Sequence, residues 1–279
     1  MKHIILGPTA SGKTAYAISL AKQVYGAVIS ADSRQVYTGM NIGTAKPREA
    51  WSDAPHAVDT PDIIEGIPHY LLNIATLNTP YTLSAWLTDT KKCIEIIESN
   101  EQVPIITGGT MLYIDALVDG YDIPAIEPDI AFREKLEEKS AEELYKELLQ
   151  KDPAASSFIE PHNSRRIIRA LEVMHATGKK FSDVRKKNKT NTDFEITGIF
   201  ENYDVLRDRI TKRAEIMVQE GLADEIAHLR NTYPEAKLLQ TMNYKENCDL
   251  EKMVQVNMRY AHRQMSWWKR RTDINWICG

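Results

Sequence analysis

Apolar and polar positions in the N-terminal part of the chain predict strands and helices in alternation. Residues 3–6 and 27–31 are short, continuously apolar runs, which are typical of buried strands. Residues 14–24 and 82–100 instead place apolar side chains every three or four positions, as on one face of a helix. Another buried strand is expected over residues 103–109. This order predicts an α/β fold with a parallel sheet flanked by helices.

The pattern changes near residue 129. Residues 129–150 and 164–178 have helical periodicity, and no strand pattern lies between them. We therefore expect an inserted, mostly helical domain over residues 121–193. It would separate a first part of the α/β core, residues 1–120, from a second part, residues 194–279.

The second part of the core begins with a strand pattern. Residues 194–202 predict a strand, and residues 203–231 predict one long helix after it. A further helix is expected over residues 250–271, and a last short strand over residues 274–278. No internal repeat is evident.

Composition and charge narrow the class of protein. The chain has 279 residues, of which 43% are hydrophobic and 27% charged, as in ordinary globular proteins. A formal charge of −4 argues against indiscriminate nucleic-acid binding. Basic residues nevertheless gather locally: residues 165–189 hold nine Lys or Arg against two acidic residues, and residues 259–271 form a second run. Either run alone is more typical of a solvated helix face.

Targeting signals and cysteine chemistry are not indicated. No apolar stretch reaches the roughly 20 residues that a membrane helix needs, and the first residues do not have the layout of a signal peptide. Cys93, Cys248 and Cys278 lie far apart in no metal-ligand spacing, so we expect free thiols. These features predict a cytoplasmic protein that does not contact membranes.

One segment carries a specific chemical signal. GPTASGKT, residues 7–14, matches the P-loop pattern G-x-x-x-x-G-K-[ST] between a predicted strand and a predicted helix. Gly7 and Gly12 allow successive backbone N–H groups to face an anion. Lys13 adds a positive charge, and Thr14 a hydroxyl suited to a phosphate-bound Mg²⁺. The segment predicts a phosphate site without specifying what the phosphate is attached to.

Asp32 follows the strand predicted at residues 27–31, which we expect beside the P-loop. It has two interpretations. It could be a metal-associated carboxylate or a cap of a following turn. It could also lie at the carboxyl end of its strand as a base that takes a proton from an acceptor substrate, because ligands of α/β sheets bind at that edge.

The sequence resembles one family, the tRNA dimethylallyltransferases, also called tRNA isopentenyltransferases, over nearly its whole length. The resemblance is carried by blocks in a fixed order: GPTASGKT, SADSRQVYTGMNIGTAKP (30–47), PHYLLNI (68–74), GGTMLYIDALVDG (108–120), RRIIRALEV (165–173), RITKR (209–213) and RYAHRQMSWW (259–268). It implies a P-loop NTPase-like core with the helical insertion.

The resemblance also implies a reaction. The P-loop would hold the diphosphate of dimethylallyl diphosphate instead of ATP. The dimethylallyl group would pass to N6 of the adenosine immediately 3′ of the anticodon, in tRNAs that read codons starting with U. Asp32 would be the general base, Thr14 would act with Mg²⁺, and Arg209 and Arg213 would clamp the diphosphate.

The same resemblance implies the binding residues and partners. Diphosphate contacts are implied at Gly7, Thr9, Ala10, Ser11, Gly12, Lys13 and Thr14. Contacts with tRNA are implied at Asp32, Ser33, Arg34, Gln35, Thr110, Arg165, Arg166, Arg169, Gln240, Tyr244 and Lys245. The expected partners are the anticodon stem-loop and dimethylallyl diphosphate, bound by a monomer.

The residue chemistry agrees with this expectation. Arginine's planar fork suits phosphate oxygens, and Arg209 and Arg213 are four residues apart on one helix face. Surface ion pairs with Asp208 or Glu215 are the alternative. Anticodon loops offer bases that proteins read by stacking. Trp267, Trp268 and Tyr260 could stack on bases, but we expect the tryptophans to pack in the core.

Two positions depart from the family pattern. Asn243 stands where relatives usually have Gly, and Asn tolerates a positive φ better than most residues. His262 stands where a basic, lysine-like residue is common, which would weaken one phosphate contact. These departures leave the chemical centre intact and are compatible with a divergent second copy that has a narrower role.

Three alternatives remain at this point. A P-loop kinase of a small nucleotide or metabolite explains the loop, Asp32 and Mg²⁺, but not the basic runs. Transfer to a free adenine nucleotide, as by adenylate isopentenyltransferases, is less compatible with the long basic C-terminal part. A non-catalytic RNA-binding protein would not need the intact loop together with Asp32.

Overall fold

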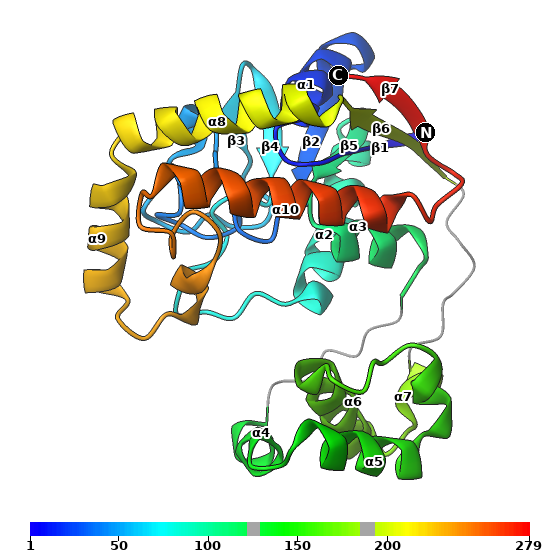
Figure 1. The fold of residues 1–279 in the computed structure, drawn as a ribbon. Helices are drawn as coiled ribbons and strands as arrows, with labels where there is room; N and C mark the ends of the chain where they lie inside the picture. The colour runs from blue at the N-terminus through cyan, green and yellow to red at the C-terminus, as the bar shows by residue number, and fades with distance from the viewer. Residues whose placement is uncertain (122–128, 185–192) are drawn as a thin grey trace. The chain divides into compact units, whose positions relative to one another are not determined.

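The computed structural model describes residues 1–121, 129–184 and 193–279. The chain divides into two compact units, shown in Figure 1. Residues 1–118 and 192–279 form what we call the α/β unit, and residues 119–191 form the helical unit. Both boundaries lie two residues before the expected limits of the insertion, 121 and 193.

One sheet organises the α/β unit. In the described residues it has seven strands: β1 (Lys2–Leu6), β2 (Gly26–Ser30), β3 (Asp62–Ile64), β4 (Ile67–Tyr70), β5 (Val103–Gly108), β6 (Phe194–Phe200) and β7 (Asn275–Cys278). Their order is β3-β4-β2-β5-β1-β6-β7, and every neighbouring pair is parallel except β3 with β4. The predicted parallel α/β sheet is confirmed.

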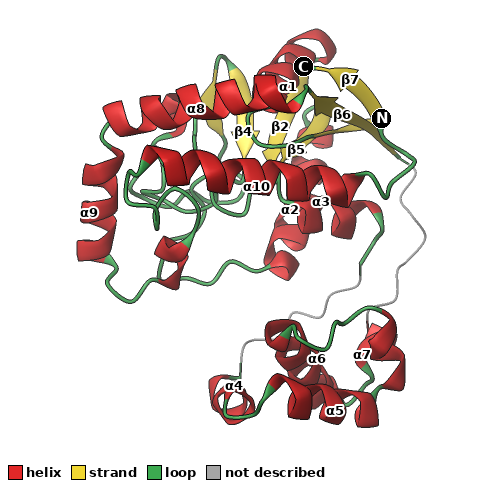
Figure 2. Ribbon diagram, viewed as in Figure 1, coloured by secondary structure: helices red, strands yellow, loops and turns green. Residues whose placement is uncertain are grey.

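Helices of the α/β unit surround this sheet (Figure 2). They are α1 (Lys13–Val24), α2 (Leu83–Ser99), α3 (Met111–Val118), α8 (Tyr203–Gln219), α9 (Leu222–Thr232) and α10 (Leu250–Trp268). Ala17 and Ala21 of α1 pack on Ile5, Val28 and Ile105 of the central strands. This packing fixes the start of α1 over the sheet, directly after β1.

The helical unit has its own apolar core. Its described helices are α4 (Ile130–Glu137), α5 (Ala141–Lys151), α6 (Ser164–Thr177) and the short α7 (Phe181–Val184). Leu144 and Leu148 of α5 pack with Ile167 and Leu171 of α6. The expected helical insertion is therefore a unit with a separate core.

Two predicted helices are in fact interrupted. The helix expected over residues 203–231 breaks at Gly221, whose φ of 98° is left-handed, so α8 and α9 are separate. The segment 129–150 breaks before α5, where Ser140 and Glu143 form a reciprocal capping box. Both breaks have local signals, a glycine and a Ser-x-x-Glu spacing, which outweigh the apolar periodicity.

The carboxyl ends of three strands bring the predicted site residues together. The P-loop follows β1, Asp32 follows β2, and Thr110 follows β5. Because β5 lies between β2 and β1, the expectation that the strand of Asp32 lies beside that of the P-loop is wrong. The three loops still meet at one edge of the sheet, where α/β proteins bind ligands.

No helix in the described parts of the chain is long and apolar enough to cross a membrane.

Candidate active site

Residues 7–14, which match the P-loop pattern, form the loop between β1 and α1. Gly7 has a φ of 152°, and a Cβ there would lie 2.2 Å from the carbonyl oxygen of Ile199, so no larger residue fits. Gly12, with a φ of 91°, caps the start of α1. The first N–H groups of a helix have no partner within it, and the helix dipole is positive there. This loop is therefore built to bind an anion.

The surroundings of Lys13 in the loop fix its ammonium group and lower its pKa. Its ammonium donates a hydrogen bond to the carbonyl oxygen of Pro8 at 2.6 Å. Burial lowers the pKa of Lys13 to about 7, with a further lowering by Arg213 and an opposing effect of Asp32. An anion bound at the loop would favour the charged form of Lys13.

Two loop N–H groups are already engaged. That of Thr9 donates to Oε1 of Gln264 at 2.8 Å, and that of Ser11 donates to the carbonyl oxygen of Pro8 at 3.3 Å. The backbone of Thr9, an expected diphosphate contact, is therefore not free in this structure. The hydroxyl of Ser11 is buried and has no hydrogen-bond partner among the described residues. It suits an oxygen of a bound ligand.

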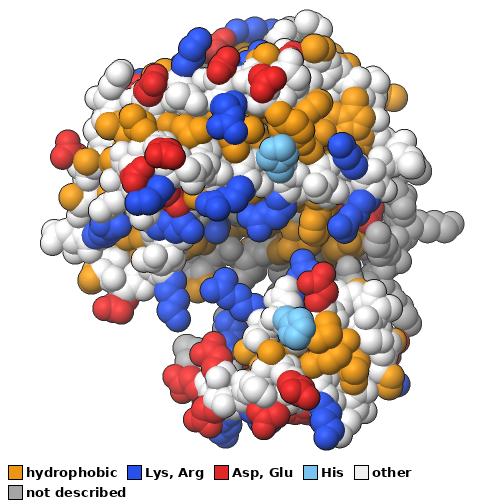
Figure 3. All heavy atoms as spheres, in the orientation of Figure 1, with side chains coloured by type: hydrophobic (Ala, Val, Ile, Leu, Met, Phe, Trp, Pro, Cys, Tyr) orange, Lys and Arg blue, Asp and Glu red, His pale blue; other side chains and the backbone are white. Residues whose placement is uncertain are grey.

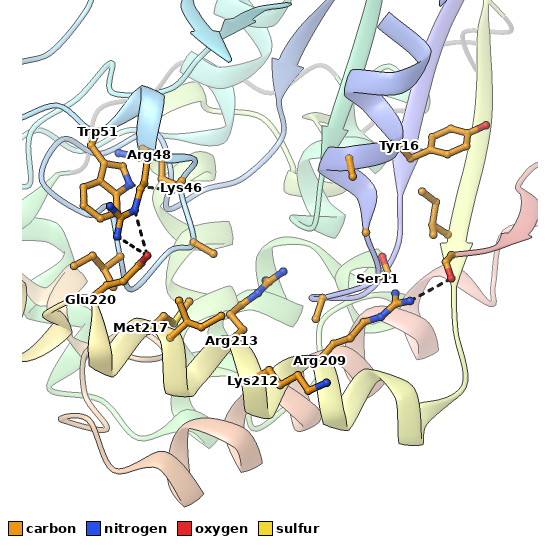
Figure 4. Close-up of a pocket in the computed structure, with 18 of the residues that line it drawn as sticks. Ser11, Tyr16, Lys46, Arg48, Trp51, Arg209, Lys212, Arg213, Met217 and Glu220 are labelled. Carbon is orange, nitrogen blue, oxygen red and sulfur yellow. Dashed lines mark hydrogen bonds and ion pairs between the residues drawn. The ribbon is translucent and has the colours of Figure 1, made fainter. Parts of the chain in front are cut away.

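A cavity of about 770 Å³ opens beside this loop (Figure 4). Four parts of the α/β unit form its wall: the loop with α1, the segment from 42 to 51, α8, and the C-terminal end with β6. The lining residues are Ala10, Ser11, Gly12, Ala15, Tyr16, Ile42, Ala45, Lys46, Arg48, Trp51, Ile199, Arg209, Lys212, Arg213, Ile216, Met217, Glu220, Ile277, Cys278 and Gly279.

The end of the cavity near Ser11 is basic. Arg209, Lys212 and Arg213 of α8 line it, so the expected pair of arginines does share one helix face. Neither arginine pairs with Asp208 or Glu215 within the described residues, and Arg209 donates to a main-chain oxygen of Gly279, the last residue of the sequence, at 3.4 Å. Burial lowers the pKa of Arg213. In the part of the chain that the structure describes, no Asp or Glu side chain forms an ion pair with these cations.

The other end of the cavity combines apolar side chains with a fixed rim. Ile42, Trp51 and Met217 contribute apolar surface. Arg48 lies 5.2 Å from the ring centre of Trp51 and pairs with Glu220 at 2.7 Å, as Figure 4 shows. These residues were not predicted individually, although residues 42–47 belong to a block that carried the resemblance.

Lys46 is held in place inside the protein and lines this end of the cavity. Its ammonium donates to the carbonyl oxygen of Tyr37 at 2.8 Å, to Oδ1 of Asn41 at 3.1 Å, and to Oδ1 of Asn73. Burial lowers its pKa to about 8. All three donors of the ammonium are used, so Lys46 shapes the wall of the cavity.

Asp32 has one carboxylate oxygen engaged and one available. Oδ1 accepts the N–H groups of Arg34 at 2.8 Å and Gln35 at 3.4 Å, as in the turn cap considered above. The described residues offer no hydrogen bond to Oδ2. The charge of Asp32 acts on Lys13, and it adds to the effect of burial that raises the pKa of Tyr260 to about 12. Asp32 therefore lies within electrostatic reach of both the P-loop and α10.

The predicted contacts next to Asp32 form one loop cluster. The hydroxyl of Thr110 accepts the N–H of Ser33 at 2.9 Å, and the N–H of Thr110 donates to Ala31 at 3.1 Å. Arg34 donates to the hydroxyl of Thr241 at 2.9 Å. Gln35 donates to the carbonyl oxygen of Thr44 at 3.1 Å. These bonds hold Ser33, Arg34, Gln35 and Thr110 in one cluster beside Asp32.

The segment from 240 to 245 divides into exposed and buried residues. Gln240 and Lys245 are exposed, as RNA contacts would need to be. Tyr244 is fully buried, and its hydroxyl donates to Glu225 at 2.7 Å. The side chain of Tyr244 packs in the core, and the expected contact of this residue with tRNA stays a prediction. Glu225 also accepts the N–H of Ile42 at 2.7 Å, so Tyr244 supports the cavity wall indirectly.

Asn243 keeps the turn that a glycine would allow. Its φ is 72°, and its side-chain amide donates to the carbonyl oxygen of Gly43 at 2.8 Å. Asn257 of α10 donates to Oδ1 of Asn243 at 2.7 Å. The prediction that Asn sustains this turn is confirmed, and its side chain adds bonds that a glycine could not make.

The arginines predicted in the helical unit lie on α6. Arg165 and Arg166 are exposed. Arg169 pairs with the buried Glu172 at 2.6 Å, and Arg133 of α4 pairs with the same carboxylate at 2.7 Å. Burial raises the pKa of Glu172, but the hydrogen bonds from the two arginines outweigh it and lower the pKa. Residues 185–189 of the first basic run lie outside the described residues.

The second basic run, residues 259–271, covers the C-terminal half of α10 and the three residues after it. Figure 3 shows Lys and Arg side chains gathered across the face of the α/β unit that carries this helix. Trp268 is fully buried, and Trp267 is half-buried with its indole N–H bonded to Asp115 at 2.7 Å, so the expected packing role is confirmed. His262 is exposed and stacks on Tyr203 with ring centres 4.0 Å apart.

The described residues contain no group of three or more His, Cys, Asp or Glu side chains that could hold a metal ion. A Mg²⁺ bound with a substrate's phosphates keeps several waters and needs only one or two protein ligands. Thr14 is exposed in the first turn of α1, directly after the loop. Its hydroxyl fits such a site.

Family models and curated relatives match this chain along its length. The model described as IPP transferase matches residues 35–271, and the model described as isopentenyl transferase matches residues 1–53. The tRNA dimethylallyltransferase of Geobacillus kaustophilus is 37% identical over 98% of this chain and 89% of its own length. That of Bacillus mycoides is 34% identical, covering 98% and 88%.

Solved structures give the same fold. A tRNA delta(2)-isopentenylpyrophosphate transferase from Staphylococcus epidermidis aligns with a TM-score of 0.66 and 33% identity, over 100% of this chain and 93% of its own. A eukaryotic dimethylallyltransferase described as acting on tRNA aligns with a TM-score of 0.81 over 99% of this chain and 73% of its own. Its identity is 24%, so it supports the fold alone.

Proposed function

We propose that this chain, which belongs to the IPP transferase family, transfers the dimethylallyl group of dimethylallyl diphosphate to N6 of an adenosine in tRNA. We place that adenosine immediately 3′ of the anticodon, in tRNAs that read codons starting with U. Diphosphate is the other product.

One observation carries this proposal. The cavity joins an anion-binding end, formed by the P-loop, Arg209 and Arg213, to an end with apolar walls around Trp51 and Met217. An allylic diphosphate has the same two parts, a doubly charged head and a short apolar tail. A kinase would need room for a nucleotide and for the acceptor of its phosphate, but it would not need an apolar wall for a five-carbon tail.

Stabilising the leaving diphosphate is the main task of the basic end. The C1–O bond of an allylic diphosphate loosens as positive charge grows on the allyl carbon. Negative charge then collects on the diphosphate, where N–H groups at the start of α1, Lys13, Arg209 and Arg213 offset it. A Mg²⁺ held by the Thr14 hydroxyl and the diphosphate would supply further positive charge.

Asp32 completes the reaction on the acceptor. Adenine N6 forms the new bond to C1, the C1–O bond breaks, and N6 becomes acidic as the bond forms. Oδ2 of Asp32 takes the proton from N6, while Oδ1 stays bound to the N–H of Arg34 and fixes the carboxylate. Proton, carbon and diphosphate are thereby all accounted for.

Binding of tRNA would use residues around Asp32 and on exposed helices. N6 must leave the base stack to reach the cavity, so the adenosine is extruded from the loop. Ser33, Arg34, Gln35 and Thr110 lie around Asp32, and Gln240 and Lys245 are exposed nearby in sequence to Thr241, which binds Arg34. Arg165 and Arg166, which are exposed on α6 of the helical unit, would hold phosphates, and Arg169, the third arginine implied there, would do so only if its ion pair with Glu172 opens. The protein would act as a monomer in the cytoplasm.

Mass spectrometry of tRNA nucleosides tests this function. Cells that carry the gene should contain N6-dimethylallyladenosine that disappears on deletion and returns with the wild-type gene but not with Asp32→Asn. Nuclease fragments that carry the modification should map next to the anticodon. Modification confined to free adenine nucleotides would instead support the adenylate alternative, and an unchanged nucleoside profile would contradict the proposal.

A further inference from the structure

Gln264 of α10 bridges two loops that belong to different halves of the site. Its Oε1 accepts the N–H of Thr9 in the P-loop at 2.8 Å, although the two residues are 255 positions apart. Its Nε2 donates to the carbonyl oxygen of Gly109, after β5, at 2.9 Å. The side chain is 1% exposed. Both ends of one buried amide are therefore used to join the two loops.

The bridge is reinforced at Gly109. The hydroxyl of Tyr260, one turn earlier on α10, donates to the same carbonyl oxygen at 3.0 Å. A Cβ at Gly109 would lie 2.6 Å from Nε2 of Gln264, and no other atom outside the flanking residues lies within 4 Å apart from Cδ of Gln264. A side chain at position 109 would therefore displace this amide before it met any other group.

The connection continues to the base. Thr110, next to Gly109, accepts the N–H of Ser33 at 2.9 Å and donates its own N–H to Ala31 at 3.1 Å. Ala31 and Ser33 flank Asp32. Hydrogen bonds therefore run from the P-loop through Gln264 to the two neighbours of Asp32, and α10 supplies the central link.

We propose that Gln264 is a positioning residue that sets the P-loop at a fixed distance from Asp32. The inference rests on the proposed function, because only a reaction that uses both loops at once depends on their separation. The diphosphate leaves from one loop while Asp32 takes the proton beside the other. A displacement of about 1 Å between such groups costs roughly 10²-fold in rate.

Gln264→Met tests the bridge with the whole chain. Methionine fills a similar volume but cannot accept the Thr9 N–H or donate to Gly109. We expect kcat for transfer from dimethylallyl diphosphate to tRNA to fall about 10- to 100-fold. The Kd of inorganic diphosphate and the KM for tRNA should stay within about threefold of wild type, because the binding groups remain.

Trp267→Phe is the matched control on the same helix. It removes the bond of α10 to Asp115 and leaves the Gln264 bridge. Its thermal midpoint should fall as far as that of Gln264→Met, while its kcat stays near wild type. If both variants lose kcat in proportion to stability, α10 acts only as a structural support and the proposal is wrong.

Gly109→Ala is a second way to break the bridge that Gln264 makes between the two loops. The new methyl displaces the Gln264 amide, so kcat should fall as in Gln264→Met. In the double variant Gly109→Ala, Gln264→Ala the clash is removed but the bridge is still missing, so stability should recover while kcat stays low. Recovery of wild-type kcat in the double variant would overturn the proposal. If the wild-type protein itself transferred no dimethylallyl group to tRNA, the proposed function would be wrong.

Discussion

The two units use the same charged residues in opposite ways. In the helical unit, Arg133 and Arg169 bind the carboxylate of Glu172, which is 1% exposed, at 2.7 and 2.6 Å. In the α/β unit, Arg209 and Arg213 face a cavity, and neither pairs with an Asp or Glu side chain among the described residues. One set of arginines is neutralised within the chain, and the other is left for an external anion.

The carboxylates of the two units differ in the same way as the arginines. Both oxygens of Glu172 accept hydrogen bonds from arginine, whereas Asp32 binds two backbone N–H groups through Oδ1 alone. Leaving buried charges unpaired reduces stability, and the lowered pKa of Arg213 reflects that cost. An arginine that faces a cavity without an ion pair therefore indicates a site for an anionic ligand. An arginine that is paired with a buried carboxylate indicates a structural role.

The largest effect is expected from Asp32→Asn. The amide cannot take the N6 proton, so kcat should fall about 10²- to 10⁴-fold while diphosphate affinity persists. Single-turnover transfer of label to tRNA measures kcat, and calorimetry measures diphosphate binding. Asp208→Asn, an exposed carboxylate on α8, is the control and should retain wild-type turnover. Equal turnover of both variants would remove Asp32 as the base.

Arg213→Gln is expected to have the next largest effect. It removes one cation that stabilises the leaving diphosphate, so kcat should fall about 10²- to 10³-fold with folding stability kept or increased. Arg169→Gln provides the comparison, because it removes an arginine that is already neutralised. Its effect should be on stability of the helical unit instead of kcat. Similar losses of kcat in both variants would break the distinction between the two units.

Glu172→Gln should destabilise the helical unit. Arg133 and Arg169 would lose their buried partner at a cost of about 2 kcal/mol, measured by urea unfolding of the whole chain. Because the folded-state pKa of Glu172 is lowered, its stabilisation is complete above the usual glutamate range and is lost as pH falls through the folded value. The difference in stability between wild type and the variant should therefore shrink in acid.

Diphosphate binding should depend on pH through Lys13. The free protein holds this lysine with a pKa of about 7, and a bound anion favours its charged form. Affinity should therefore be full below pH 7 and weaken by up to about tenfold per pH unit above it. Lys13→Ala should show only the ionisation of diphosphate itself. Identical pH profiles for the two proteins would contradict this assignment.

The smallest effect concerns salt dependence of tRNA binding. Arg165 and Arg166 are exposed on α6, whereas Arg169 on the same helix is paired with Glu172. Replacing either exposed arginine with Gln should reduce the slope of log K against log salt by about 0.7 to 0.9. Arg169→Gln should change it less. A larger change for Arg169 would show that its ion pair opens when tRNA binds.

Much of the fold was predictable because its signals are local. Apolar runs and periodicity located β1, β2, β5, α1 and α2, and the change near residue 129 located the helical unit. The short hairpin of β3 and β4 was missed, since strands of three and four residues have too little periodicity to detect. The break at Gly221 was also missed, although the glycine itself was a signal.

The residues of the candidate site could likewise be predicted from the sequence only where the signal is local. The P-loop belongs to a motif whose chemistry can be read locally. Asp32 had two interpretations, and the diphosphate clamp of Arg209 and Arg213 was implied by the family resemblance, so these roles stay predictions. Trp51, Lys46 and Gln264 were not predicted, because their roles depend on contacts that the fold alone creates. A contact of Tyr244 with tRNA was implied by the family resemblance alone, whereas long-range packing against Gly43 and Glu225 buries its side chain.

The most direct test of the central claim is a competition between dimethylallyl diphosphate and ATP for the purified protein. Labelled dimethylallyl diphosphate, unmodified tRNA, Mg²⁺ and an excess of ATP are combined, and label in tRNA, free diphosphate and ADP are measured together. We predict that label enters adenosine in tRNA, that one diphosphate is released for each transfer, and that no ADP forms. Formation of ADP with no label in tRNA would contradict the account.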